Sequence, residues 1–209
     1  MSDPPKLLHR NKPSRLVDLE SMAGAIHDFL VAAGIDMGHT HLVGTPERVA
    51  KAWSDELLDG YDSNPAEILK ESFDAEERHS NRASEIVLAK DIPFHGLCPH
   101  HLLPFQGVAH VGYIPDQKLA PFSGLARVID CFAHRLEVQE TITRQVADAL
   151  VNHLGAKGAA VVLESEQTCM TVRGVKRRGT RIITTYFAGV FDTQTDLRRD
   201  FLRLIEKLG

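Results

Sequence analysis

The order of strand-like and helix-like segments in the second half of the 209-residue chain constrains its fold most strongly. Two segments rich in β-forming residues precede two segments with helical periodicity, and two further strand-like segments follow. In chain order these segments are 85–89, 107–114, 125–132, 138–150, 159–164 and 181–190. Because strands and helices come in separate runs, the order β-β-α-α-β-β predicts an α+β fold rather than a doubly wound sheet. Two helices on one face of an antiparallel sheet leave its edges open, which favours self-association.

The residues that flank this pattern are predicted to be mainly helical. Residues 1–15 look like a flexible arm, and helices are expected over 19–34 and over 45–60, the second opening on an N-capping threonine followed by proline. The polar stretch 74–83 is expected to be a loop, and 195–208 a charged amphipathic helix. We therefore divide the chain into an N-terminal arm with helices, 1–85, and a sheet domain with the C-terminal helix, 86–209.

Charge and cysteine content narrow the classes of function. The formal net charge of −4 argues against a general nucleic-acid binder, which would carry a large basic excess. No apolar run approaches the roughly 20 residues needed to span a bilayer, and the first residues lack the apolar stretch of a secretory signal. Three cysteines, an odd number, indicate reduced thiols rather than a disulfide framework. We expect a cytoplasmic protein with no nucleic-acid or membrane partner.

A Cys-Pro-His-His motif at 98–101 lies in a short segment between two of the strand-like stretches. Cys98 and His101 are three residues apart, so a tight turn can direct both at one ion, and zinc prefers thiolate and imidazole ligands. A structural zinc site normally needs four protein ligands, of which this motif supplies two. The spacing alone leaves two interpretations open: a zinc site, or a loop whose histidine makes ordinary hydrogen bonds.

The other two cysteines are the candidates for a distant third ligand. Cys131 lies among apolar residues of a predicted helix, which favours a small buried core residue. Cys169 follows the end of a predicted strand, where loops often carry function. Three protein ligands would leave the fourth zinc position to water, as in catalytic sites, and zinc makes that water nucleophilic near neutral pH.

Three segments together resemble the GTP cyclohydrolase I family. They are Cys98-Pro99-His100-His101-Leu102-Leu103-Pro104-Phe105 with Gly107 and His110, Val138-Gln139-Glu140-Thr141-Ile142-Thr143, and Cys169-Met170-Thr171-Val172-Arg173-Gly174. The segments occur in the family's order and spacing, and the resemblance covers roughly Thr45 to Phe191. It implies that 86–209 is a catalytic domain with a tunnelling fold (T-fold), built on a four-stranded antiparallel sheet and two helices. It also implies a ring-shaped homo-oligomer, a decamer built from pentameric rings.

The resemblance further implies an activity and a role for each matching residue. The family opens the guanine ring of GTP at C8, releases formate and closes the product 7,8-dihydroneopterin triphosphate, which leads to tetrahydrofolate and pterins. The Zn²⁺ cofactor would be bound by Cys98, His101 and Cys169. Beside it, proton transfer would fall to His100, and the later ribose steps to Ser123. GTP would be held at its guanine edge by Glu140, with Gln139 next to it, and at its phosphates by Arg127, Arg173 and Arg48.

Three positions depart from the family's pattern. Gln167 stands where the family carries a histidine that acts as a general acid and base, and glutamine cannot exchange a proton near pH 7. Glu166 and His100 are the candidates to replace it. Gly124 stands where a phosphate-binding lysine is usual, a charge that Lys118 or Lys176 could replace. Pro99 stands in place of a glutamate, and stiffens the turn.

These departures leave three hypotheses. The first is a working GTP cyclohydrolase I. The second is a related zinc cyclohydrolase that stops at a ring-opened pyrimidine or uses another purine. The third is a non-catalytic ring protein that binds a purine or pterin and has a structural zinc. Zinc content and a GTP assay with identification of the product distinguish them.

Overall fold

The fold is taken from a computed structural model, which describes residues 15–74 and 85–207. By internal contacts the chain forms two compact units, 1–51 and 52–209. The expected arm at 1–15 and the expected loop at 74–83 lie almost wholly outside the described residues. None of the described helices is long and apolar enough to cross a membrane. The proposed division at residues 85 and 86 remains a prediction about domains.

The N-terminal unit contains helix α1 (Leu19–Ala32), the short 3-10 turn η1 (Thr40–Leu42) and most of α2 (Thr45–Ala52). Asp18 caps α1 by accepting the backbone N–H of Ser21 at 2.9 Å. Gly34 follows with a φ of 77°, as expected for the residue that ends a helix. No residue of α1 is buried, although the helix carries exposed apolar side chains such as Phe29.

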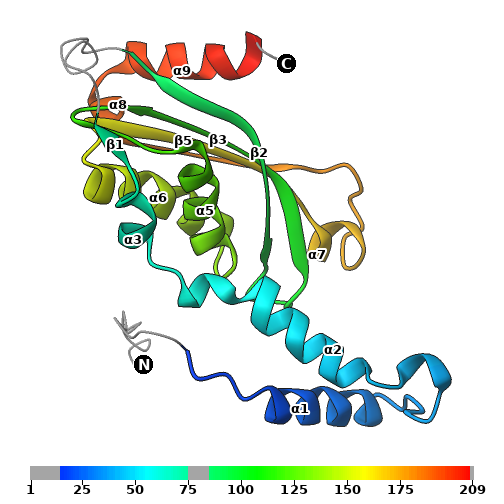
Figure 1. The fold of residues 1–209 in the computed structure, drawn as a ribbon. Coiled ribbons are helices and arrows are strands. Elements are labelled where there is room, and N and C mark those ends of the chain that lie inside the picture. Colours follow the sequence, from blue (N-terminus) through cyan, green and yellow to red (C-terminus); the bar gives the residue numbers. More distant parts are fainter. Residues whose placement is uncertain (1–14, 75–84, 208–209) are drawn as a thin grey trace, which may run out of the picture. The chain divides into compact units, whose positions relative to one another are not determined.

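The second unit is built on a four-stranded antiparallel sheet of order β2-β3-β5-β6 (Figure 1). Its strands are β2 (Val87–Leu97), β3 (Pro104–Ile114), β5 (Gly158–Gln167) and β6 (Ile182–Gly189). Helices α5 (Phe122–Ala133) and α6 (Gln139–Ala149) lie between the two strand pairs in sequence and pack on one face of the sheet. The predicted β-β-α-α-β-β order and α+β class, with the T-fold arrangement, are confirmed.

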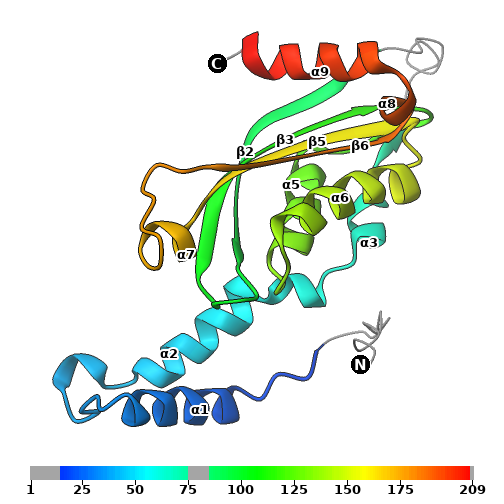
Figure 2. The same ribbon diagram turned by 180° about the vertical axis from the view of Figure 1, so that it is seen from behind.

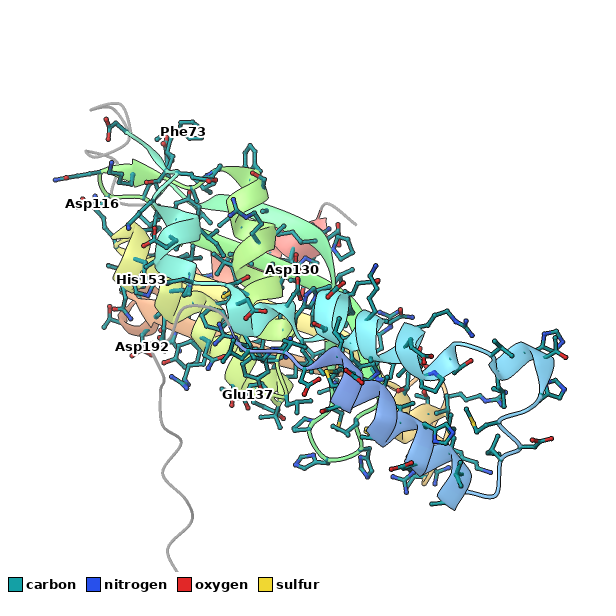
Figure 3. All side chains as sticks on the ribbon, turned by 60° about the horizontal axis from the view of Figure 1, so that its bottom comes forward. Phe73, Asp116, Asp130, Glu137, His153 and Asp192 are labelled. Carbon is teal, nitrogen blue, oxygen red and sulfur yellow. The ribbon has the colours of Figure 1, made fainter. Side chains whose placement is uncertain are left out.

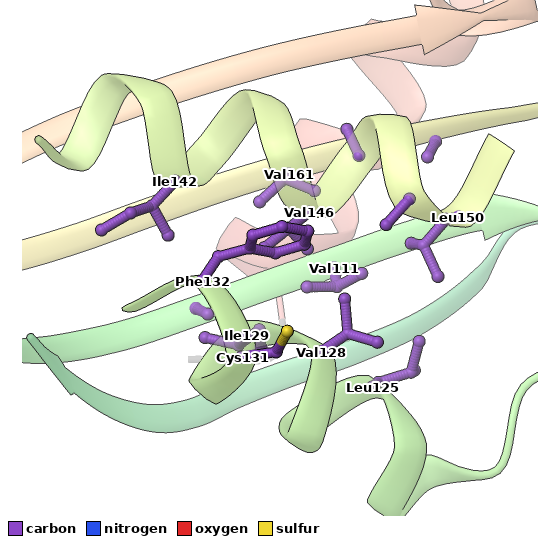
Figure 4. Packing of buried hydrophobic residues seen from close by; sticks show 14 of the residues in the cluster. Val111, Leu125, Val128, Ile129, Cys131, Phe132, Ile142, Val146, Leu150 and Val161 are labelled. Atoms are coloured by element: carbon purple, nitrogen blue, oxygen red, sulfur yellow. The ribbon is translucent and has the colours of Figure 1, made fainter. Parts of the chain in front are cut away.

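The main core lies between the sheet and these two helices. Its fully buried residues include Val111, Val128, Ile142 and Val161, whose side chains meet between the helices and the strands (Figure 4). After α6 the chain makes a π-helical turn, η4 (Leu150–Leu154), and ends it at Gly155 with a φ of 76°. The helical periodicity therefore gave a correct position for both helices.

A smaller core covers part of the opposite sheet face. Helices α8 (Val190–Thr193) and α9 (Thr195–Lys207) follow β6 and pack there, as seen from behind in Figure 2. Phe191 and Phe201 are fully buried beside Ile114 of β3 and Ala160 of β5. The C-terminal helix expected at 195–208 is thus confirmed, and its role is to cover the sheet.

The structure corrects the strand boundaries. The strand predicted at 85–89 continues to Leu97, because a β-bulge between Ala89 and Ile92, where Asp91 has a φ of 56°, absorbs the break in the apolar pattern. The strand predicted at 107–114 begins at Pro104. The edge strand β2 accepts Pro93 beyond its bulge, and Pro104 stands at the first position of β3, where a strand also accepts proline.

The helix expected over 45–60 is present as α2 continued by the π-helical turn η2 (Trp53–Leu57). Several short elements had no clear signal in the sequence. They are the 3-10 turn η3 (Asp59–Asp62), helix α3 (Pro65–Leu69), helix α7 (Thr168–Thr171) and the two-stranded pair β1 (Phe73–Asp74) with β4 (Lys118–Leu119). Each of these elements is too short for its apolar residues to show a helical or strand periodicity. Both η3 and α3 pack against α5.

Candidate metal centre

The register of the sheet brings the two halves of the Cys-His motif to one place. Leu97 at the end of β2 pairs with Pro104 at the start of β3, so Cys98 and His101 lie in the turn between the two strands. The next residue of β3, Phe105, pairs with Gln167 at the end of β5. Cys169 follows in α7, at the same end of the sheet. A methyl group at Gly107 would lie 1.9 Å from Glu164 O, so glycine permits this close approach of β3 and β5.

The turn holds Cys98 in a defined position. Its N–H donates to Leu103 O at 2.9 Å, and its carbonyl accepts from the N–H of Leu102 at 2.8 Å. Leu102 has a φ of 55°, a left-handed conformation that lets the chain reverse within so few residues. Both histidines thereby approach the thiol, since Cys98 Sγ lies 3.9 Å from His100 Nδ1 and 3.8 Å from His101 Nδ1.

Cys98, His101 and Cys169 form a group with the geometry of a metal site. One ligand atom from each residue lies within 4.8 Å of the other two. Tetrahedral zinc with its usual bond lengths places its ligand atoms about 3.5–4 Å apart, which this group approaches without rearrangement of the fold. Among the described residues no other group of three such side chains is as close. The donor set of two thiols and one imidazole fits zinc.

The electrostatics of the site suit a cation. Burial raises the pKa of the Cys169 thiol, and the neighbouring Cys98 thiol raises it further. Two thiolates so close repel each other unless a positive ion lies between them. Cys131, the other candidate, is buried in α5, and its thiol lies 3.4 Å from Ser63 O rather than near Cys98.

Gln167, two residues before Cys169, faces the interior of the sheet and helix layer. Its side-chain nitrogen donates to Gln139 Oε1 and to Ser165 Oγ, each at 3.0 Å. Gln139 itself is only 3% exposed. Successive residues of a strand face opposite ways, and Glu166 accordingly lines a different hollow of about 610 Å³, with His95, Asp130 and His134 among its walls.

Glu140 is exposed at the start of α6 and opens on a recess of about 410 Å³. The recess is lined by Glu140, Thr141 and Arg144 of α6 and by Thr184, Thr185 and Tyr186 of β6. Arg173 lies in the exposed loop that follows α7, and is close enough to Cys169 to lower its pKa slightly, against the larger effect of burial. The structure therefore places these two predicted substrate residues on the unit that holds the metal group.

Ser123 and Arg127 lie elsewhere. Ser123 lines an apolar hollow with Phe73 and Val87, at the end of β2 opposite to Cys98. In Figure 3 the side chain of Phe73 is well separated from Glu137, which lies just before α6. Arg127 is bound to Glu71, with Nη1 2.8 Å from the carboxylate. One chain does not bring these two residues to the metal group.

Arg48 belongs to the N-terminal unit. Its guanidinium donates to Val43 O at 2.8 Å and to Thr45 Oγ1 at 2.7 Å, contacts that brace the start of α2. Its role toward a substrate stays a prediction.

The sequence assigns no role to three hydroxyl residues that surround Gln139: Thr143, Ser165 and Thr184. Hydroxyl side chains form no recognisable motif, and these three come from three separate elements. The one available signal was the alternation of β5, which places polar Ser165 and Gln167 on the same face as buried Leu163.

Comparison with known proteins identifies close relatives over most of the chain. Residues 22–206 match the family described as GTP cyclohydrolase I. The GTP cyclohydrolase 1 of Chromobacterium violaceum is 42% identical over 193 residues, 92% of this chain and 91% of the relative. That of Ralstonia nicotianae is 41% identical over 198 residues (95% and 92%), and that of Dehalococcoides mccartyi strain BAV1 is 40% identical over 196 residues (93% and 100%).

Among solved structures, the crystal structure of the archaeosine synthase QueF-Like in the apo form is similar over 52% of this chain and 97% of that chain. The TM-score is 0.43 and the sequence identity 14%. This likeness is too slight to support an inference.

Proposed function

Since the chain belongs to the GTP cyclohydrolase I family, we propose that Cys98, His101 and Cys169 bind a catalytic zinc ion at which the guanine ring of GTP is opened. The protein is a hydrolase of the purine ring of GTP, and its reaction consumes water and yields formate and 7,8-dihydroneopterin triphosphate. The observation that carries the zinc assignment is the convergence of three ligand atoms, from two distant segments, within 4.8 Å. A zinc ion held there supplies Lewis acidity that makes water nucleophilic near neutral pH.

The nucleotide is recognised at the recess beside α6. The exposed carboxylate of Glu140 can accept two parallel N–H bonds from the edge of guanine, whereas adenine lacks this pair of donors. Arg173, in the loop after Cys169, can bind phosphate oxygens through its planar fork of donors.

Proton transfer at the site falls to His100. Its ring lies beside Cys98, and its exposed position leaves it accessible to a substrate. Glu166, the other candidate to replace the family's histidine, lines a hollow on the opposite face of β5. Gln167 cannot substitute, because a carboxamide does not exchange a proton near pH 7. Both of its N–H bonds are also directed at interior acceptors.

Because Gly124 stands where the family usually has a lysine, the phosphate-binding residues of this chain include one cation fewer. The surroundings of Gly124 favour glycine. A methyl group there would lie 2.9 Å from Pro121 Cγ, so a larger residue would displace the start of α5. The exposed loop after α7 carries further cations, Lys176 among them, that can bind the triphosphate.

We propose a ring-shaped homo-oligomer, a decamer of two pentameric rings, because one chain leaves both its sheet and its site incomplete. In the described part of the chain, edge strands β2 and β6 each have only one strand partner. Ser123 lies at the opposite end of β2 from Cys98, so a neighbouring subunit must supply it to the site. The exposed apolar side chains of α1 offer a further contact surface. The reduced thiols of the site suit the cytoplasm.

A second candidate function, ring opening without the later steps, is favoured by one observation, the glutamine at position 167. An enzyme without the family's histidine could open the ring yet fail to complete the later steps, and would then release a ring-opened pyrimidine.

Zinc analysis and one GTP assay with product identification test the proposal. We expect about one zinc per chain and conversion of GTP to a product that becomes a fluorescent pterin on oxidation, both lost after treatment with a chelator. A formamidopyrimidine or diaminopyrimidine that accumulates would favour the second candidate. Tight nucleotide binding with no turnover of any purine would contradict both.

A further inference from the structure

A buried hydrogen-bond network ties the first residue of α6 to strands β5 and β6. The carboxamide oxygen of Gln139 accepts from Ser165 Oγ at 2.6 Å and from Gln167 Nε2 at 3.0 Å. Its nitrogen lies 3.0–3.1 Å from three acceptors, which are Leu163 O, Ile182 O and Thr184 Oγ1. An amide has two acceptor sites and two hydrogens, so none of them remains for a ligand.

The partners fix which way this amide points. Two of the groups facing its nitrogen are carbonyl oxygens, which can only accept, so the nitrogen must lie on that side. Thr143 Oγ1 donates its hydrogen to Gln139 O at 2.7 Å. Thr184 must therefore donate to Thr143, 2.6 Å away, while it accepts from Gln139. The hydrogen bonds close a circuit with one consistent arrangement.

This hydrogen-bond network adjoins Glu140, the proposed guanine acceptor. Glu140 follows Gln139 in the first turn of α6, and its recess is lined by Thr184 of the same network. On its other side the network reaches Gln167, two residues from the metal-binding Cys169. A rigid network of this kind holds the Glu140 carboxylate in a constant position relative to β6 and to the metal group.

We propose that Thr143, Ser165 and Gln167 are positioning residues, which act through Gln139 to hold Glu140 in place for the guanine edge. The inference rests on the proposed function, because it takes Glu140 to be the guanine acceptor. It assigns Gln139 a supporting role beneath the nucleotide, and it gives Gln167 an orienting role in place of proton transfer.

Selectivity is the property that this network controls. Guanine offers two donors to Glu140, its ring N–H and its exocyclic amino group, and both bonds form only if the carboxylate is correctly turned. Hypoxanthine, the base of ITP, lacks the amino group and offers one donor. A displaced Glu140 therefore weakens GTP binding more than ITP binding, whereas a general loss of folded protein lowers both equally.

The test compares Ser165→Ala and the pair Thr143→Val and Thr143→Ser. Ser165 and Thr143 are 0% and 1% exposed, so neither contacts a nucleotide directly. We expect Ser165→Ala and Thr143→Val each to lower the ratio of kcat/KM for GTP to that for ITP about fivefold, mainly through KM, with zinc content unchanged. Thr143→Ser keeps the hydroxyl and should restore the ratio. Thr193→Val, an exposed threonine on α8, is the matched control.

Two results would overturn the inference for different reasons. An equal loss toward GTP and ITP, or no loss, in the Ser165 and Thr143 variants would remove the positioning role and leave the proposed function intact. Absence of GTP turnover in the unmodified, zinc-loaded protein would contradict the proposed function and the inference with it.

Discussion

At the scale of single residues, the three cysteines have the different surroundings that the sequence predicts for them. Cys98 and Cys169 lie beside His101, whereas Cys131 is 1% exposed within α5 and its pKa is raised by burial. The sequence could separate them because apolar neighbours mark a core position and a strand end marks a loop. It could not predict the partners of Gln139, because a hydroxyl on one strand and an amide on a distant helix share no pattern until the fold brings them together.

Removing one thiol at a time tests this distinction. We expect Cys169→Ser to lose zinc and GTP turnover, because two protein ligands hold zinc far more weakly than three. Cys131→Ala should keep its zinc and its turnover while the protein unfolds at a lower temperature, because a buried group is lost. Metal analysis and thermal unfolding measure both effects. Equal zinc content in the two variants would contradict the assignment of Cys169.

Gln167→His tests whether proton transfer limits the rate. A histidine restores a group that exchanges protons near pH 7, so we expect kcat to rise about tenfold or more, with a new pH dependence near 6–7. Neutral histidine has one ring N–H where glutamine has two, so KM for GTP should rise slightly as the Gln139 network loosens. Steady-state kinetics between pH 5.5 and 8.5 give both quantities. A lower or unchanged kcat would show that another step is limiting.

At the scale of elements, the periodicity of apolar residues predicted the long, regular helices. It missed the strand boundaries, which depend on pairing with a neighbouring strand. The helices α5 and α6, and the end of the following turn η4 at Gly155, follow from apolar spacing and a glycine stop. Strand β2 was predicted at less than half its length, because Asp91 and Pro93 break its alternation. The break is tolerated only because β3 supplies partners on both sides of the bulge, which a local pattern cannot show.

The bulge of β2 predicts a pH dependence of stability. Burial lowers the pKa of His110, against the opposing effect of the Asp91 carboxylate. The neutral ring accepts the N–H of Asp91 through Nδ1 at 3.2 Å, a bond that protonation would abolish. Because the folded pKa lies below the unfolded value of about 6.5, the unfolded chain binds more protons between the two. This contribution to stability is fully present above about pH 6.5 and is lost as the pH falls through the folded pKa.

His110→Asn provides the comparison, because its side-chain oxygen can replace Nδ1 as acceptor but does not titrate. We expect the free energy of unfolding of the unmodified protein, measured with urea, to fall more steeply from pH 7 to pH 5 than that of the variant. Parallel curves would contradict the assignment of this slope to His110.

At the scale of the whole molecule, one chain does not bring all the predicted site residues together. The metal group and Glu140 lie on one unit, whereas Ser123 lines a hollow at the far end of the sheet and Arg127 is bound to Glu71. Within residues 15–74 and 85–207 the outer edges of β2 and β6 are unpaired, and these edges and the exposed residues of α1 offer surfaces for assembly. The sequence predicted the ring only through resemblance to a family, because subunit contacts leave no local pattern.

Mixed assemblies of two inactive variants test whether neighbouring subunits share a site. Cys169→Ser would lack the proposed metal but retain Arg127, and Arg127→Ala would lack the proposed phosphate-binding arginine but retain the metal. If each site takes the metal group from one subunit and Arg127 from another, random co-assembly restores one intact site in four, or about a quarter of wild-type turnover. If each site draws both from one chain, co-assembly restores none. Coexpression of two differently tagged chains, tandem purification and sedimentation analysis give the turnover and the subunit number of the same mixed sample. Each parent assembled alone is the control, and a mixture no more active than its parents would contradict a shared site.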